Sequence, residues 1–545
     1  MKFLNIAVIF LTLSTSAFAE RIGGTRIRKG NDLAGVITDS RTGKGIKGVA
    51  VSDGYGFTVT DKRGVYQMKA DPRARTVWYR TPSGFRMAQD ETGAPAFYAY
   101  RNASSKLDRH DFSLEPLDAQ EDNFTLLIMA DPQCQSAYDV GRLRDETLPD
   151  VRRTLDEGIA SGRYSPNVYG IGLGDIIYDN FEIWAPMREL FRSVGYGGGR
   201  VPVYNIPGNH DHSNKVTNAY DAIDNYVRNF GPQDYSFDRG QVHFVMMDNI
   251  IFTGTQPDTK MKPWNNCLYD SGFSDEQMEW LKQDLALVED KEDKLVVLCT
   301  HSPFRQGSKS GGGNVNYGRH YDDVLSALTQ FKNAEILIGH THYPETYVHE
   351  GYVCKGGTPV REHIFGSVSG AWWHTNTCVD GTPNGYAVYQ VGGTVFTDEV
   401  ARFTGHPESH QMRVYDGNQV YNGTKGVEFK WEDDLKGKFV ASIWYADPLN
   451  WKVEFIRDGV ATPMEQVTRR QRDWCCYSYF INENGRRPDN KSYHTNRLHY
   501  WTFTAPSGDP SSEKGWVIRA THTVPGSGKV HVYECSRLQE GYEGL

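Results

Sequence analysis

The stretch Val168-Tyr169-Gly170-Ile171-Gly172-Leu173-Gly174-Asp175 decides the fold, because an apolar run ends there in a glycine and a carboxylate. A short apolar run bounded by turn residues is typical of a buried strand. Comparable runs occur at residues 124–130, 203–206, 243–247, 294–300 and 335–338. Because these runs alternate with helical patterns, the middle of the chain is predicted to be an α/β domain.

Two helices of this domain are visible as apolar stripes. Leu148, Val151, Leu155 and Ile159 recur at spacings of three and four residues, which places them on one face of a helix. Ser274 and Gln277 form a capping-box pattern ahead of a second stripe that begins at Met278. Both stripes are expected to face the core.

Five predicted strands are followed by potential metal ligands. The segments are Asp131-Pro132-Gln133, Gly174-Asp175, Gly208-Asn209-His210-Asp211, Thr300-His301 and Gly339-His340-Thr341-His342. Each alone is typical of a turn or a surface position. Because residues just beyond the carboxyl ends of strands converge on one crevice, their joint occurrence indicates a shared site for divalent cations.

This ordered set resembles the calcineurin-like metallophosphoesterase family over residues 120–393. The resemblance implies a four-layer α/β sandwich, with two central sheets covered by helices. It also implies two metal ions bridged by Asp175. The remaining ligands would be Asp131, Gln133 and His342 for the first ion, and Asn209, His301 and His340 for the second.

Gln133 departs from the commonest family pattern, which has a histidine at that position. An amide oxygen is a neutral and weaker donor than imidazole, so Mn²⁺ or Mg²⁺ is expected in preference to Zn²⁺ or iron, which remain possible. The Asp-Pro-Gln form resembles a subgroup that includes protein serine/threonine phosphatase-like members. The alternative interpretation is a degenerate, metal-poor site.

The mechanism expected of two close cations is attack by a metal-bridging hydroxide on the phosphorus. His210 is expected to act as the general acid for the leaving group, with Asp211 orienting its imidazole. The predicted function is hydrolysis of phosphate esters, with monoesters favoured over diesters. A non-catalytic protein that binds a surface polymer, with a vestigial phosphoesterase domain, is the alternative.

Other residues near these motifs allow two interpretations or carry a smaller role. His212 is expected either to touch the substrate phosphate or to be a surface histidine, and Asp179 to brace its own loop. Trp372 and Trp373 are interpreted as core packing in preference to a wall of the crevice. The run Gly311-Gly312-Gly313 lacks the lysine of a phosphate-binding loop and is interpreted as a flexible segment.

The predicted division is a signal peptide at 1–19, an N-terminal β-sandwich at 20–117, the phosphoesterase domain at 118–393 and a C-terminal β-rich domain at 394–545. Through Gly45-Ile46-Lys47-Gly48-Val49 and Thr60-Asp61-Lys62-Arg63-Gly64, the first domain resembles the carboxypeptidase-regulatory-like β-sandwich. That resemblance implies an accessory module. Three to four domains also agree with the length of 545 residues.

Charge and the N-terminal sequence bear on location and partners. The formal net charge of −9 gives no electrostatic basis for bulk nucleic-acid binding. Lys2, an apolar core at 6–13 and Ala17-Phe18-Ala19 form a secretory signal pattern, so the protein is expected to be exported, periplasmic or secreted, with no membrane span. Native substrate and oligomeric state are not readable from the sequence.

Eight cysteines in an exported chain permit disulfides. Cys354 and Cys378, which flank one region, are the favoured pair. Cys134 and Cys299 lie at the ends of apolar runs and are expected to be buried free thiols. For the adjacent Cys475 and Cys476, pairing with other cysteines and reduced thiols are both open.

Overall fold

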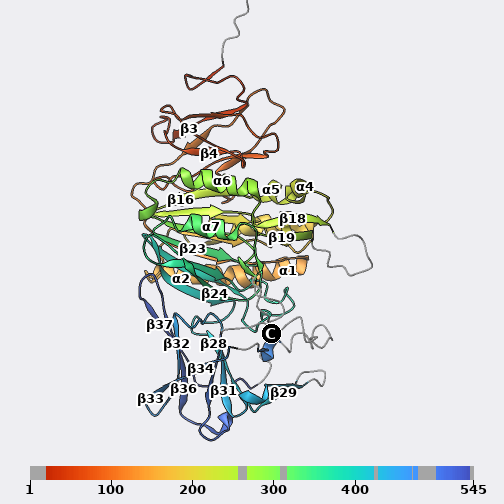
Figure 1. Ribbon diagram of the computed structural model, residues 1–545, viewed down its shortest axis with the longest axis vertical. Coiled ribbons are helices and arrows are strands. Elements are labelled where there is room, and N and C mark those ends of the chain that lie inside the picture. The colour runs from red at the N-terminus through yellow and green to blue at the C-terminus, as the bar shows by residue number, and fades with distance from the viewer. Residues whose placement is uncertain are drawn as a thin grey trace, which may run out of the picture.

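The computed structural model describes residues 20–255, 267–306, 316–422, 428–468, 471–476 and 499–540. Three tiers follow one another along the long axis of the molecule (Figure 1). An N-terminal β-sandwich lies at one end, an α/β unit occupies the middle and a β-rich region forms the other end.

The first central sheet of the α/β unit has five strands in the order β15-β12-β11-β26-β27. Its members are β11 (Asn123–Met129), β12 (Val168–Leu173), β15 (Val203–Ile206), β26 (Gly385–Gly392) and β27 (Val395–Phe403). β11, β12 and β15 are parallel, so their carboxyl ends meet at one edge of the sheet. β26 and β27 run antiparallel, and the predicted boundary at residue 393 falls in the turn between them.

The second central sheet has six strands in the order β16-β17-β20-β23-β25-β24. They are β16 (Tyr235–Arg239), β17 (Val242–Met246), β20 (Leu295–Cys299), β23 (Asn333–Ile338), β24 (Glu345–Val353) and β25 (Pro359–Ile364). β17, β20, β23 and β25 are parallel. The six strands predicted from apolar runs therefore all form, with ends that differ by no more than two residues.

Helices cover the outer faces of both sheets. They are α1 (Ala137–Arg142), the π-helical turn η1 (Leu143–Thr147), α2 (Leu148–Ala160), α3 (Trp184–Ser193), α4 (Ala219–Ala222), α5 (Asp224–Phe230), α6 (Asp275–Ala286) and α7 (Tyr321–Leu328). Val151 and Leu155 of α2 pack with Leu127 and Met129 of β11. α6 begins with the predicted capping box, in which the Ser274 and Gln277 side chains bond each other's backbone.

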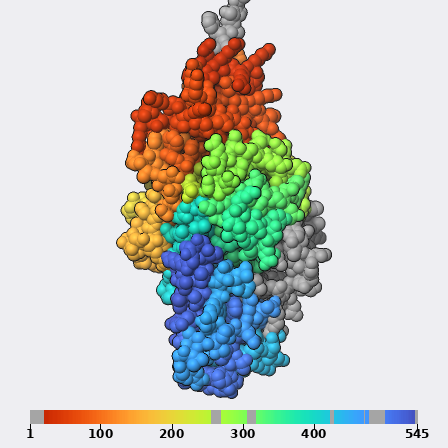
Figure 2. Space-filling model, turned by 60° about the vertical axis from the view of Figure 1, so that its left-hand side comes forward, coloured from red at the N-terminus to blue at the C-terminus, as the bar shows by residue number. Residues whose placement is uncertain are grey.

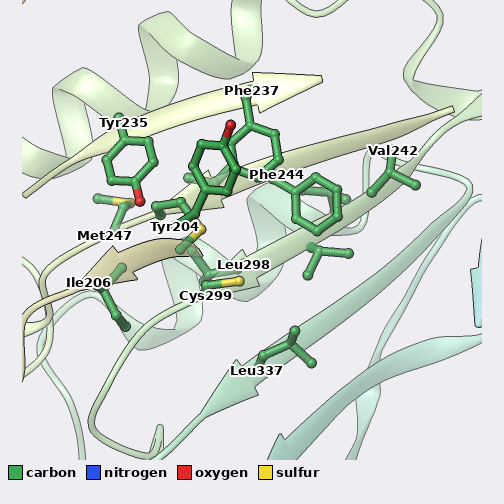
Figure 3. Packing of buried hydrophobic residues seen from close by; sticks show 14 of the residues in the cluster. Tyr204, Ile206, Tyr235, Phe237, Val242, Phe244, Met247, Leu298, Cys299 and Leu337 are labelled. Carbon is green, nitrogen blue, oxygen red and sulfur yellow. The ribbon is translucent and has the colours of Figure 1, made fainter. Parts of the chain in front are cut away.

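The two sheets enclose an aromatic core. Leu126 and Ile128 of β11 point inward, opposite to their neighbours Leu127 and Met129, as the alternation along a strand requires. Tyr204 of β15 packs on Phe237 of β16 with ring centroids 4.4 Å apart (Figure 3). The predicted four-layer α/β sandwich is therefore confirmed.

The N-terminal sandwich lies next to α6 (Figure 1), and its atoms cover one end of the α/β unit (Figure 2). One sheet contains β3 (Leu33–Asp39), β6 (Val65–Met68), β9 (Asp108–Arg109) and β10 (Phe112–Leu114), and the other β4 (Ala50–Ser52), β5 (Phe57–Val59), β7 (Thr76–Tyr79) and β8 (Tyr98–Tyr100). Trp280 of α6 packs on Trp78, with ring centroids 6.1 Å apart. Arg80 forms a buried ion pair with Asp284, so the two units share one interior.

The C-terminal region contains two four-stranded sheets and the two-stranded sheet of β29 (Val420–Asn422) and β30 (Glu428–Lys430), so it is β-rich as predicted. The first four-stranded sheet contains β28 (Met412–Asp416), β31 (Lys438–Ile443), β35 (Tyr500–Thr504) and β34 (Glu465–Gln466). The second contains β33 (Val460–Pro463), β32 (Trp451–Arg457), β36 (Trp516–Thr523) and β37 (Val530–Cys535). β27 is joined to this region by polar contacts, because Asp398 pairs with His531 of β37 at 2.6 Å.

The expected bridge between Cys354 and Cys378 is wrong, because both are free, buried thiols. Cys354 belongs to the large core at the end of β24, whereas the Cys378 thiol donates to the carbonyl of Ser367, 3.6 Å away. Cys134 and Cys299 are buried free thiols, as expected, and Cys475 and Cys476 are buried as well.

Candidate metal centre

Each predicted ligand follows the carboxyl end of a central strand. Asp131 and Gln133 follow β11, Asp175 follows β12 and Asn209 follows β15 in the first sheet. In the second sheet, His301 follows β20, and His340 and His342 follow β23. The edge where both sets of parallel strands end therefore brings seven ligands from five segments together.

Five of these residues have left-handed backbone conformations. The φ angles are 51° for Asp131, 38° for Gln133, 49° for Asp175, 72° for His340 and 58° for His342. Such angles are costly for residues other than glycine and cluster at functional sites. These residues directly follow β11, β12 and β23, and the turns that they form keep their side chains at the sheet edge.

The first half of the site surrounds Asp131. His342 Nε2 lies 3.6 Å from Asp131 Oδ1. The Gln133 amide donates to Asp175 Oδ2 at 2.6 Å. Ligand atoms of Asp131, Asp175 and His342 all lie within 4.8 Å of one another, close enough for one cation to contact all three.

The second half shares Asp175 with the first. His301 Nε2 lies 3.3 Å from both Asp175 Oδ1 and Asn209 Oδ1. His340 Nδ1 lies 3.2 Å from His301 Nε2, and Asp175, His301 and His340 form a second group within 4.8 Å. The structure therefore brings together all seven predicted ligands, with Asp175 common to both groups.

The orientation of His301 leaves one nitrogen available as a ligand. Its Nδ1 lies 2.7 Å from the carbonyl oxygen of Leu173. A carbonyl only accepts, so Nδ1 carries the hydrogen, and Nε2 is the nitrogen that faces the centre. This backbone contact fixes both the tautomer and the direction of the ring.

Burial and crowding shift the pKa values of these groups in opposite directions. Burial raises the pKa of Asp131 to about 8, although His301 opposes the shift. Burial lowers the pKa of His342 to about 4, and burial with the neighbouring His301 lowers that of His340 to about 3. Neutral imidazoles are the form that binds metal ions.

The residues present fit divalent cations. Oε1 of Gln133 is buried and has no hydrogen-bond partner among the described residues. Leaving a buried acceptor unpaired costs roughly 1–3 kcal/mol, and a cation supplies the missing partner. Carboxylate, carboxamide and imidazole together form a donor set for hard or borderline ions, since no thiolate takes part.

His210 lies beside this centre and is buried. Its backbone N–H donates to Asp175 Oδ1 at 2.9 Å, and its Nδ1 lies 3.0 Å from Asp179 Oδ2. The Tyr178 ring covers the imidazole, with centroids 4.3 Å apart. Burial opposes protonation, but the carboxylates of Asp175 and Asp179 outweigh it and raise the pKa of His210, favouring the imidazolium.

Asp211 does not occupy its expected position. Its carboxylate accepts the backbone N–H groups of Ile176, Ile177 and Gly208 at 3.1, 3.1 and 2.9 Å. It therefore ties two ligand loops together, while Asp179 pairs with the imidazole. In the sequence, the pairing of Asp179 with His210 is indicated only by the position of Asp179, four residues beyond Asp175 on the same loop.

His212 matches neither expected role. It is buried, with Nδ1 2.8 Å from the carbonyl of Gly208 and Nε2 2.9 Å from Asp248 Oδ2. Both ring nitrogens face acceptors, so the imidazole is held by the scaffold. Gly311-Gly312-Gly313 lies outside the described residues.

The two tryptophans take different roles. Trp373 is buried and donates from Nε1 to the carbonyl of Pro132 at 2.6 Å, which agrees with core packing. Trp372 is partly exposed and packs on His342, with ring centroids 5.3 Å apart. One of the pair therefore lies in the core and the other walls the centre.

No sequence pattern predicted that Tyr269 and Arg142 would lie near the centre. The Tyr269 hydroxyl on β19 (Cys267–Ser271) lies 3.5 Å from His340 Nε2. Arg142 donates to the carbonyl of Trp373 at 2.6 Å and also contacts the Asn376 side chain. The two contacts of Arg142 hold the loop that carries Trp372.

Comparisons with known proteins agree with this geometry. Family models match residues 31–117 (N terminal of calcineurin-like phosphoesterase), 124–344 (calcineurin-like phosphoesterase) and 362–524 (C terminal of calcineurin-like phosphoesterase). Purple acid phosphatase 15 of Arabidopsis thaliana is 26% identical over 203 residues, covering 34% of this chain and 32% of that protein. The chain thus spans about a third of the length of this curated relative.

Two solved structures are similar at low scores. A purple acid phosphatase from yellow lupin (Lupinus luteus) seeds has a TM-score of 0.30 and 13% identity, covering 76% of this chain and 68% of that one. The NAD nucleotidase of Haemophilus influenzae has a TM-score of 0.28 and 10% identity, covering 57% of this chain and 54% of that one.

Proposed function

Because the chain belongs to the calcineurin-like phosphoesterase family, we propose that it is a metal-dependent hydrolase of phosphoric esters and that it cleaves phosphate monoesters with His210 as proton donor. The observation that carries this proposal is the convergence of the six other predicted ligands around Asp175, with a buried imidazole beside them.

The family's centre is dinuclear, and the chain offers two overlapping ligand groups. Asp131, Gln133, Asp175 and His342 would hold one ion, and Asp175, Asn209, His301 and His340 the other. Ions bound there supply an activated water and neutralise charge on the phosphoryl group. We favour Mn²⁺ or Mg²⁺, because the amide of Gln133 is a hard, neutral donor.

His210 is placed to protonate the leaving oxygen. Asp179 engages Nδ1, so Nε2 is the nitrogen left to give its proton to the alkoxide. The backbone N–H of His210 is anchored on Asp175, which fixes the imidazole relative to the ligand groups. Asp179 keeps the ring oriented and favours its charged form.

Support for a monoester comes from the curated relative, which is named a phosphatase. Trp372 and Tyr269 flank the centre on two sides and would contact the group esterified to the phosphate. A diester remains the competing substrate, since the same ligands serve both reactions.

Export is part of the proposal and rests on the N-terminal sequence. Lys2, the apolar core and Ala17-Phe18-Ala19 support cleavage after residue 19 and a periplasmic or secreted location. These residues lie outside the described part of the chain. In the part that the structure describes, no helix has the length and apolar character needed to cross a membrane. N-terminal sequencing of the mature protein tests the cleavage.

Metal analysis combined with hydrolysis of p-nitrophenyl mono- and diesters tests the function. Activity should require added Mn²⁺ or Mg²⁺, disappear with chelator and be highest for the monoester. Asp175→Asn should abolish it while the fold is retained by circular dichroism. Chelator-resistant activity, or wild-type turnover of Asp175→Asn, would overturn the metal mechanism, whereas a diester preference would overturn only the substrate assignment.

A further inference from the structure

A cavity separate from the metal centre lies between the N-terminal sandwich and the α/β unit. Its volume is about 290 Å³, and none of the seven ligands lines it. The walls come from the turn after β4, the segment before β7, the helix α4, the strand β18 (Ile250–Thr255) and the start of α6. A hexose-sized molecule fits a space of this volume.

Two buried carboxyl groups of the cavity lining, Asp53 and Asp234, have no cationic partner in the described part of the chain. Asp234 is 7% exposed, and its Oδ1 accepts the backbone N–H of Asp248 at 3.0 Å and the Gln277 amide at 3.1 Å. Burial and the neighbouring Asp248 raise the pKa of Asp234 to about 7. A carboxyl group in this state both donates and accepts hydrogen bonds.

The other charged groups that line the cavity already have partners, and Asp53 is satisfied by the backbone N–H groups of Tyr55, Gly56 and Asp71. Arg73 lies 3.0 Å from Glu276, and Arg75 lies 3.1 Å from Asp224. His212 lies 2.9 Å from Asp248. A ligand with a strong net charge would find no free counter-ion among these groups, so the lining favours a neutral ligand.

Two tyrosine rings form part of the wall, and each is contacted by an arginine that also lines the cavity. The Arg75 guanidinium lies 3.4 Å from the centroid of Tyr220, and that of Arg73 lies 4.4 Å from the centroid of Tyr55. Tyr220 remains 42% exposed. Aromatic faces combined with a few convergent polar groups are the features of a small-molecule site.

We propose that this interdomain cavity binds a neutral, hydroxyl-rich ligand, a mono- or disaccharide. Asp234 and Gln277 would bond its hydroxyl groups, and Tyr220 would pack on the apolar face of the sugar ring. The site does not depend on the phosphoesterase reaction. Because its walls come from two units, an occupied cavity would also hold the sandwich on α6.

Saturation-transfer difference NMR on the full-length protein tests the proposal. The probes are methyl β-glucopyranoside, N-acetylglucosamine and maltose, with choline and inorganic phosphate as charged comparators. At least one sugar should receive saturation from the protein, and chelation of metals should not remove the signal. Absence of signal for all three sugars, or binding of choline alone, would overturn the proposal.

Two variants locate the binding. Asp234→Asn and Tyr220→Ala should each weaken the sugar affinity at least tenfold, with thermal unfolding measured to confirm the fold. Tyr138→Ala, which truncates a tyrosine 68% exposed on α1 and away from the cavity lining, is the matched control and should bind as wild type. Because Tyr220 is exposed, its variant keeps the test decisive if Asp234→Asn does not fold. Wild-type affinity in Tyr220→Ala would place the sugar elsewhere.

Discussion

The imidazole of His210 and the carboxylate of Asp179 form a buried pair, with Nδ1 and Oδ2 3.0 Å apart. The two residues lie on different loops, one after β15 and the other after β12. Asp211, adjacent to His210 in sequence, instead binds three backbone N–H groups. The orientation of the proposed proton donor therefore depends on a contact between loops.

Asp179→Asn should reduce turnover of substrates with poor leaving groups, because the imidazole loses the carboxylate that orients it and favours its charge. The loss should be smaller than that of His210→Ala, for which roughly 10² to 10⁴ is expected from loss of a general acid. Rates for p-nitrophenyl phosphate and for an alkyl phosphate check this difference. Metal content should stay unchanged in both variants.

Asp211→Asn is the control for that series. Because Asp211 braces the ligand loops, its loss should lower metal retention and should affect good and poor leaving groups alike. A leaving-group dependence in Asp211→Asn that is absent from Asp179→Asn would reverse the two roles.

Asp175→Asn and Gln133→Ala should differ in metal stoichiometry. Asp175 belongs to both ligand groups, so its variant should lose both ions. Gln133 belongs to one, so Gln133→Ala should retain about one equivalent after dialysis. Elemental analysis by mass spectrometry measures both, and equal losses in the two variants would contradict the division of ligands.

Arg142→Ala should release the loop that carries Trp372. The guanidinium holds the Trp373 carbonyl and Asn376, so its loss should lower kcat/KM by about tenfold through a displaced substrate wall. Metal content should be unaffected. Arg144→Ala is the matched control, because that side chain is 61% exposed and pairs with the neighbouring Asp145. A similar loss in both variants would indicate a general effect of removing charge.

Asp398→Asn should lower stability in a pH-dependent manner. Burial alone would raise the pKa of Asp398, but hydrogen bonds from His531 and Lys529 lower it to about 2. Because this lies below the ordinary aspartate value, the ion pairs stabilise fully above about pH 4, and this contribution is lost as the pH falls toward 2.

Thermal unfolding from pH 6 to pH 3 measures that contribution. Asp398→Asn should lower the Tm by about 2–4 °C at pH 6, and the difference from wild type should shrink as the pH decreases. Asp458→Asn replaces an aspartate that is 92% exposed and should show no comparable difference. A Tm difference for Asp398→Asn that stays constant down to pH 3 would contradict the ion-pair explanation.

Local sequence patterns predicted the bounds of the central strands closely. A short apolar run between turn residues is most readily buried as a strand in the middle of a sheet. β12 and β15 span the predicted residues, and the capping box of α6 forms as the sequence indicates. Less was predictable for β26 and β27, which complete the five-stranded sheet as an antiparallel hairpin. The place of this hairpin depends on the pairing of β26 with β11, which lies more than 250 residues earlier in the chain.

The sequence by itself determined which donors stand at the strand ends, because parallel strands deliver such residues to one edge wherever they occur in the chain. Tertiary structure alone decided which side chain each donor meets. Asp179 lies against His210, His212 is held by Asp248, and Cys354 and Cys378 stay apart, since the direction of a side chain beyond a turn depends on loops that pack from elsewhere in the fold.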